Sequence, residues 1–153
     1  MLGISACLGG IACRYDGGSN TILPLKKLVE SGQAVMVCPE VLGGLPIPRN
    51  PAEIQGGDGF TVWENKAKVI DIEGNDLTEC FKQGAIQALD ELKHLQITAL
   101  VLKERSPSCG SNWIYDGSFS GNRIKGAGVA TAYFIQQGLP VYSEENWQEM
   151  RIT

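Results

Sequence analysis

Three cysteines in this chain each follow, directly or after a short loop, an apolar segment with the composition of a buried β-strand. They are Cys7, Cys38 and Cys109, in the segments GISACLGG, VMVCPE and LKERSPSCG. Ligands of α/β proteins gather at the carboxyl ends of the sheet strands, so the three thiols are expected to share one site. Three soft ligands that converge in this way favour a metal ion or an iron–sulfur centre.

The pattern of apolar residues predicts alternating strands and helices. Four apolar runs predict strands at 1–6, 34–37, 97–102 and 139–142. Helical spacing predicts helices at 22–29, 77–95 and 126–137, the first and last closed by Gly32 and Gly138. This alternation is typical of a mainly parallel sheet of about four strands with helices on both faces. The length of 153 residues suits one α/β domain over residues 1–153.

Three segments between these elements are less regular. Residues 40–58 are rich in Gly and Pro, and we expect them to form an irregular wall over the site. Phe60 to Trp63 and Lys68 to Ile72 are expected to pair as a small hairpin, and residues 103–125 to form a long loop. Near the end, Ser143 is expected to cap a short helix over 144–150.

Composition and charge narrow the function classes. The net charge is −4 and there is no block of basic residues, which disfavours nucleic-acid binding. No stretch approaches the roughly 18 apolar residues of a membrane span, and the first residues do not have the pattern of a signal peptide. We therefore expect a cytoplasmic protein, without a membrane or nucleic-acid partner. Five cysteines, an odd number, favour thiolate chemistry in a reducing compartment over a disulfide scaffold.

Two short motifs carry the candidate chemistry. In Cys38-Pro39-Glu40 the proline holds the thiol rigidly at a strand end, and the carboxylate of Glu40 is within reach of a molecule bound beside it. In the turn from Ser106 to Gly110, the hydroxyls of Ser106 and Ser108 surround the thiol of Cys109. The alternative for each motif is structural, because free cysteines are often packed in cores and Ser/Pro/Gly loops are common.

The other cysteines and the histidine are weaker candidates. Cys80 and His94 fall on the helix predicted from Leu77, away from every strand end, so we expect both outside the site. Cys13 shares the first loop with Cys7, and it is either a fourth ligand, a thiol beside the site, or neither.

Taken together and in order, six segments resemble a bacterial family that includes the thiouracil desulfidases. The segments are SACLGGIACRYDGG, VCPEVLGGLPIPRNPAE, LKERSPSCG, YDGSFSG, GAGVATA and VYSEEN. The resemblance implies a Rossmann-like fold and a [4Fe-4S] cluster held by three cysteines, here Cys7, Cys38 and Cys109. It also implies catalytic roles for the acid of the CPE motif, Glu40, and for a serine of the SPSC motif, Ser106 or Ser108.

These observations leave two functional hypotheses. The first is an iron–sulfur-dependent, non-redox desulfidase that removes sulfur from a small thiolated heterocycle such as 2-thiouracil, or from a similar thioamide. In this hypothesis Glu40 handles protons and a serine orients the substrate. The second is a non-catalytic iron–sulfur or metal carrier, or a redox sensor, which an exposed Cys13 would favour.

Overall fold

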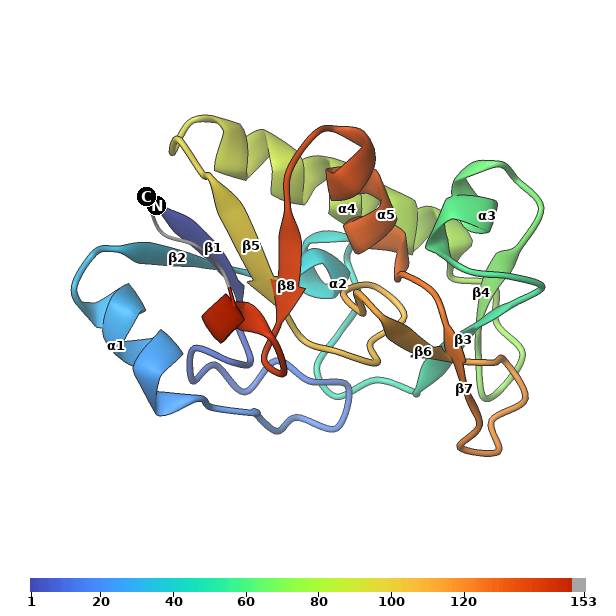
Figure 1. Cartoon of the computed structure of the whole chain (residues 1–153). Coiled ribbons are helices and arrows are strands. Elements are labelled where there is room, and N and C mark those ends of the chain that lie inside the picture. Colours follow the sequence, from blue (N-terminus) through green and yellow to red (C-terminus); the bar gives the residue numbers. More distant parts are fainter. Residues whose placement is uncertain (150–153) are drawn as a thin grey trace.

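The centre of the molecule is a four-stranded parallel sheet, seen in a computed structural model that describes residues 1–149 (Figure 1). Its strands lie in the order β2, β1, β5, β8, and each neighbouring pair is parallel. They are β1 (Leu2–Ser5), β2 (Ala34–Val37), β5 (Ala99–Leu102) and β8 (Val141–Ser143). The predicted parallel sheet of about four strands is confirmed.

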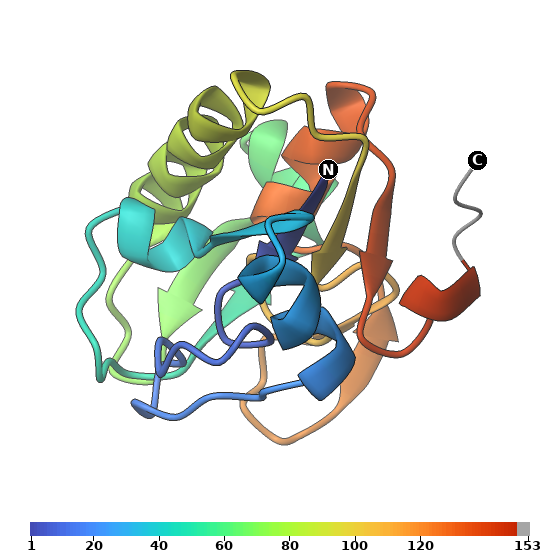
Figure 2. The ribbon, with the colours of Figure 1, turned by 90° about the vertical axis from the view of Figure 1, so that its left-hand side faces the viewer.

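Helices cover both faces of this sheet, as Figures 1 and 2 show. The helices are α1 (Leu23–Glu30), α4 (Thr78–Lys93) and α5 (Val129–Gln136). Alternate residues of a strand point to opposite faces. Leu100 and Leu102 therefore pack with α4 and α5, whereas Val101 packs on the side of α1. None of the helices described is long and apolar enough to span a membrane.

The strand order places a topological switch point at the centre of the sheet. From β1 the chain passes to β2 on one side, and then to β5 and β8 on the other. Hydrogen bonds tie the three strand ends together, since Ala6 N donates to Val37 O over 2.8 Å and Lys103 N donates to Ser5 Oγ over 2.9 Å. The crevice outside such a switch point is where open α/β sheets bind their ligands.

The predicted hairpin of Phe60–Trp63 with Lys68–Ile72 is wrong. The elements here are β3 (Ala52–Gln55), α3 (Gly59–Trp63) and β4 (Lys68–Asp71), and β4 pairs antiparallel with β3. The carboxylate of Asp58 accepts a hydrogen bond from Thr61 N, and this capping box starts a helix where aromatic and β-branched residues suggested a strand. The partner of β4 thus comes from the segment that was expected to be irregular.

Two other segments contain more regular structure than predicted. The segment 40–58 begins within the short helix α2 (Pro39–Leu42), and the expected long loop holds the ribbon of β6 (Trp113–Tyr115) and β7 (Arg123–Lys125). Each of these strands has three residues, and Ile114 is the buried one. Such short strands leave no alternation for a sequence pattern to reveal.

Helix α5 begins three residues later than predicted because the SPSC loop packs against its start. A Cβ on Gly128 would lie 2.4 Å from the carbonyl carbon of Ser108, so this close approach requires glycine. Val129 N donates to Pro107 O and Ala130 N to Ser108 O, which satisfies the first turn of the helix.

At the other end of the described chain, Ser143 Oγ accepts from Glu145 N and a 3₁₀ turn covers Trp147–Glu149. The last residue of the expected terminal helix, Met150, lies outside the described residues.

Candidate functional site

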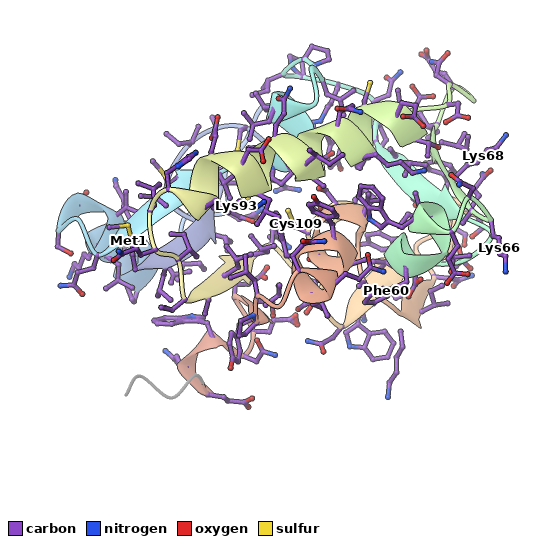
Figure 3. The ribbon with its side chains drawn as sticks, turned by 90° about the horizontal axis from the view of Figure 1, so that it is seen from above. Met1, Phe60, Lys66, Lys68, Lys93 and Cys109 are labelled. Carbon is purple, nitrogen blue, oxygen red and sulfur yellow. The ribbon has the colours of Figure 1, made fainter. Side chains whose placement is uncertain are left out.

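A cavity of about 560 Å³ lies at the carboxyl ends of β1, β2 and β5. Four free thiols line it, those of Cys7, Cys13, Cys38 and Cys109. The structure therefore brings the three strand-end cysteines to one cavity and adds Cys13 to them. Figure 3 labels Cys109, which packs in the buried cluster between the sheet and helices α4 and α5. Cys80 lies on α4 and His94 at its C-terminal end, and neither lines the cavity.

Three of the four thiols in this cavity have raised pKa values, and burial contributes to each rise. A hydrogen bond with Cys13, followed by burial, raises the pKa of Cys38 far above its ordinary value. A hydrogen bond from Cys38 lowers the pKa of Cys13. The hydrogen bond with Cys7 and burial outweigh this effect and raise the pKa to about 11. Burial and the nearby charge of Glu40 raise the pKa of Cys109 to about 12. A cationic centre among these thiols would reverse this, because thiolates are the form that binds metals.

Next to the thiols, Glu40 and Arg49 form a shielded ion pair. Arg49 Nε lies 3.5 Å from Glu40 Oε1, and the side chains are 6% and 18% exposed, respectively. Arg49 also donates to the carbonyls of Pro46 and Cys13, over 3.1 and 3.2 Å. Burial raises the pKa of Glu40, although the positive charge of Arg49 and a hydrogen bond from Ser106 oppose the rise. The cavity thus holds a carboxyl group whose neutral form is favoured by burial, against the effect of Arg49.

The two serines of the SPSC loop have different surroundings. Ser106 lines the cavity, and its hydroxyl lies close enough to the Glu40 carboxylate to lower the pKa of Glu40. The same oxygen accepts from Ser108 N and Cys109 N, over 3.1 and 3.0 Å, which fixes its position. Ser108 is fully buried outside the cavity lining, and its hydroxyl makes no hydrogen bond of good geometry. The geometry therefore distinguishes two serines that the sequence left equivalent.

Glu104 is a buried residue of the cavity lining that was missed in the sequence. It is 1% exposed, and its Oε1 accepts from the backbone N–H groups of Ser111, Asn112 and Trp113, over 2.9 to 3.0 Å. These bonds close the loop that carries Ser106 and Cys109. The sequence does place a glutamate soon after four buried strand residues. A carboxylate in that position needs hydrogen-bond donors, and this could have marked Glu104 as a structural residue.

Arg49 was also missed. Its signal is a lone cation in the Gly/Pro-rich segment GGLPIPRNP, which otherwise carries no charge. Its contact with Cys13, 36 positions away, depends on the folded chain.

The fold and the site together define a class of protein: an α/β domain with a thiol-lined cavity at the switch point of its sheet. The profile of the 2-thiouracil desulfurase family matches residues 2–146, and the chain belongs to this family. It is 46% identical to the uncharacterized protein YbbK of Bacillus subtilis (strain 168), over 98% of this chain and 99% of that protein. It is also similar to the solved structure of the [4Fe-4S]-dependent thiouracil desulfidase TudS, with a TM-score of 0.85 and 41% identity, over 97% of this chain and 93% of that one.

Proposed function

We propose that this protein is an iron–sulfur-dependent desulfidase that removes sulfur from a thiolated nucleobase such as 2-thiouracil, or from a similar thioamide. The observation that carries the proposal is the meeting of Cys7, Cys38 and Cys109 with the Glu40–Ser106 pair in one cavity. Family membership and the 41% identity to a [4Fe-4S]-dependent desulfidase support the same chemistry.

The donor set fits a [4Fe-4S] cluster held by Cys7, Cys38 and Cys109. In the part of the chain that is described, no three His, Cys, Asp or Glu side chains are arranged to hold one metal ion. A cluster suits such thiols better, because each thiolate binds its own iron and the sulfurs stand farther apart than around one ion.

Buried donors beside the cysteines also fit a cluster. Asn20 Nδ2 and Ser108 Oγ are buried without a hydrogen-bond partner. Asn20 lies next to Cys7, to whose carbonyl it donates through its backbone N–H, and Ser108 precedes Cys109. Arg14 fixes the orientation of the Asn20 amide, since a guanidinium only donates and the atom that it faces must be Oδ1. Unpartnered donors of this kind suit a group that brings acceptor atoms, as the sulfides of a cluster do.

A cluster held by Cys7, Cys38 and Cys109 would supply a Lewis acid for the sulfur of a thiocarbonyl. The protein then handles water and protons. Glu40 accepts one proton from the water that attacks the thiocarbonyl carbon and returns it to the departing sulfur, and the second proton of the water is released to solvent, so that C=S and water give C=O, hydrosulfide and one proton. Arg49 holds the carboxylate in place, and Ser106 donates to it or to the charge that develops on the substrate.

An exposed Cys13 would have favoured the carrier or sensor hypothesis. In the structure Cys13 is 4% exposed and packs in the core cluster below α1. A buried thiol is a poor partner for exchange with another protein, so the site geometry favours the enzyme.

The test of the proposal is anaerobic reconstitution with iron and sulfide, followed by measurement of hydrosulfide release from 2-thiouracil. Glu40→Gln keeps the size of the side chain and all four thiols. We expect it to retain its iron and to release sulfide at least about 100-fold more slowly, the usual scale for losing a positioned acid or base. Wild-type release by this variant would remove Glu40 from the mechanism, and no release by the wild type would reject 2-thiouracil as a substrate.

A further inference from the structure

The turn between β6 and β7 reaches the cavity from the side opposite the main sheet. Tyr115, Phe119 and Gly121, from β6 and this turn, line the cavity together with the four thiols. Figure 1 shows the β6–β7 ribbon beside β3, away from the parallel sheet. The mechanism above assigns nothing to this turn.

A partly buried carboxylate holds this turn in place at the cavity. Glu53 lies on β3, and its Oε1 accepts hydrogen bonds from Gly117 N over 2.9 Å and from Phe119 N over 3.2 Å. Gln55, on the same strand, donates from Nε2 to Gly117 O over 3.0 Å. Three bonds to two side chains of one strand set the position of the turn relative to the cavity. Bonds to a charged acceptor are the stronger kind.

The backbone of Phe119 is strained in this position. Its φ is 56°, in the left-handed region that glycine occupies freely and a bulky aromatic residue rarely adopts. Arg105, which also lines the cavity, has a φ of 66°. Strained residues persist where the surroundings hold them, and they cluster at ligand clamps and active sites.

Among the aromatic residues of the cavity, Phe119 is the one best placed to hold a planar ring. The ring of Tyr15 already carries the guanidinium of Arg14, at 5.8 Å from its centroid. Tyr115 also lines the cavity, but its ring carries a hydroxyl group that needs a hydrogen-bond partner. Phe119 lies at the turn itself, has no hydroxyl group to satisfy, and is held through its own N–H.

We propose that Phe119 binds the substrate by stacking its ring on the flat face of the thiolated heterocycle, and that Glu53 is the positioning residue that holds it there. This inference rests on the proposed function for the identity of the ring. Stacking of a base on an aromatic side chain is sequence-tolerant and contributes strongly to binding. Stacking binds the ring of the substrate, whereas the thiols and Glu40 act at its thiocarbonyl group.

The test compares 2-thiouracil with thioacetamide, a thioamide that has no aromatic ring, in the reconstituted wild type and Phe119→Leu. Leucine keeps a large apolar side chain and the same backbone strain. We expect the dissociation constant for uracil, the desulfurated ring, and the KM for 2-thiouracil to rise at least about tenfold. Iron per protein, kcat and the KM for thioacetamide should stay within about twofold of wild type. Phe119→Tyr should restore binding, and Glu53→Gln should weaken it by a smaller factor.

Trp113→Leu is the matched control, because Trp113 is an aromatic residue of the same ribbon that lies outside the cavity lining. Unchanged uracil binding and unchanged KM in Phe119→Leu would overturn the stacking role and leave the desulfidase intact. Equal losses for 2-thiouracil and thioacetamide would overturn it too, in favour of a structural effect. A wild type that binds uracil without releasing sulfide would reject the proposed function, and the stacking role would then stand or fall on uracil binding by Phe119→Leu.

Discussion

The carboxylates around the cavity have partners in the chain that stabilise their charged forms, whereas the thiols mostly lack such partners. Each carboxylate has its partners within the chain: Glu40 has Arg49 and Ser106, and Glu104 has three backbone N–H groups. The thiols have mainly one another as partners, and the pKa values of Cys13, Cys38 and Cys109 are raised, with burial contributing to each rise. Arg49 does lower the pKa of Cys13, but its charge is already paired with Glu40.

This difference separates the groups that the chain satisfies by itself from those that it leaves for something else. A buried charge is stable when it is paired and hydrogen-bonded, as the carboxylates are. Thiolates at this site need positive charge that the neighbouring side chains do not supply. The comparison therefore predicts that changes to the thiols act on a bound centre, whereas changes to the carboxylate partners act on stability or on turnover.

The largest effect is expected from Cys38→Ser. If Cys38 is one of three ligands, losing its thiolate should cost more than the roughly 10–100-fold loss of affinity that follows from removing a partner outside the ligand shell. Iron and sulfide per protein should fall to background after anaerobic reconstitution. Cys80→Ser, on α4 outside the cavity lining, is the matched control and should keep its iron.

Cys13→Ser sharpens the same comparison. Its iron should stay near the wild-type value if Cys7, Cys38 and Cys109 hold the cluster. Iron loss in Cys13→Ser as severe as in Cys38→Ser would make Cys13 a fourth ligand and contradict the proposal of a cluster held by three cysteines.

The parallel sheet and the convergence of the thiols were predictable from the sequence, and for the same reason. Residues Ala99–Leu102 are all buried, and a continuous apolar run of this kind indicates a strand covered on both faces. Once the strands are known to be parallel, their carboxyl ends lie at one edge of the sheet. Cys7 and Cys38 then meet directly at the strand ends, and Cys109 joins them because hydrogen bonds to Glu104 close the loop that carries it.

The ribbons and the polar partners were not predictable because they depend on contacts between distant segments. All three residues of β7 are exposed, so no apolar pattern marks that strand. Phe60 to Trp63 has the composition of a strand, but the side chain of Asp58 decides for a helix. The role of Glu53 depends on a turn more than 60 positions later in the chain.

Glu104→Gln tests whether a carboxylate with internal partners serves stability. The amide has one acceptor oxygen for donors that now share a carboxylate, and we expect the free energy of unfolding to fall by about 1–3 kcal/mol in urea at neutral pH. Glu79→Gln, at an exposed position of α4, should stay within about 0.5 kcal/mol of wild type. A Glu104→Gln protein as stable as wild type would contradict this role.

The pH dependence of stability gives a second comparison of the wild type with Glu104→Gln. Burial raises the pKa of Glu104, but the hydrogen bonds from Asn112, Trp113 and Ser111 outweigh it and hold the pKa below its ordinary value. In the unfolded chain a glutamate has a pKa of about 4.3, and in the folded protein the pKa of Glu104 is lower. Ionised Glu104 therefore stabilises the folded state at pH values above about 4.3. This contribution to stability is lost as the pH falls through the folded-state pKa. The difference in stability between wild type and Glu104→Gln should therefore shrink as the pH falls below about 4.

The smallest effect is expected from Ser106→Ala, which separates the two serines of the SPSC loop. The substitution removes the hydroxyl that lowers the pKa of Glu40, together with the acceptor for Ser108 N and Cys109 N. A single hydrogen bond contributes about 0.5–1.5 kcal/mol, so kcat for sulfide release should fall by up to about tenfold. Ser108→Ala is the comparison of equal size, because Ser108 lies outside the cavity lining, and its loss should act on iron content rather than on kcat at equal iron. Iron per protein is measured for both variants, since each lies close to Cys109. If Ser108→Ala slows turnover as much as Ser106→Ala at equal iron content, the loop acts through its packing, and the hydroxyl of Ser106 has no special part in the reaction.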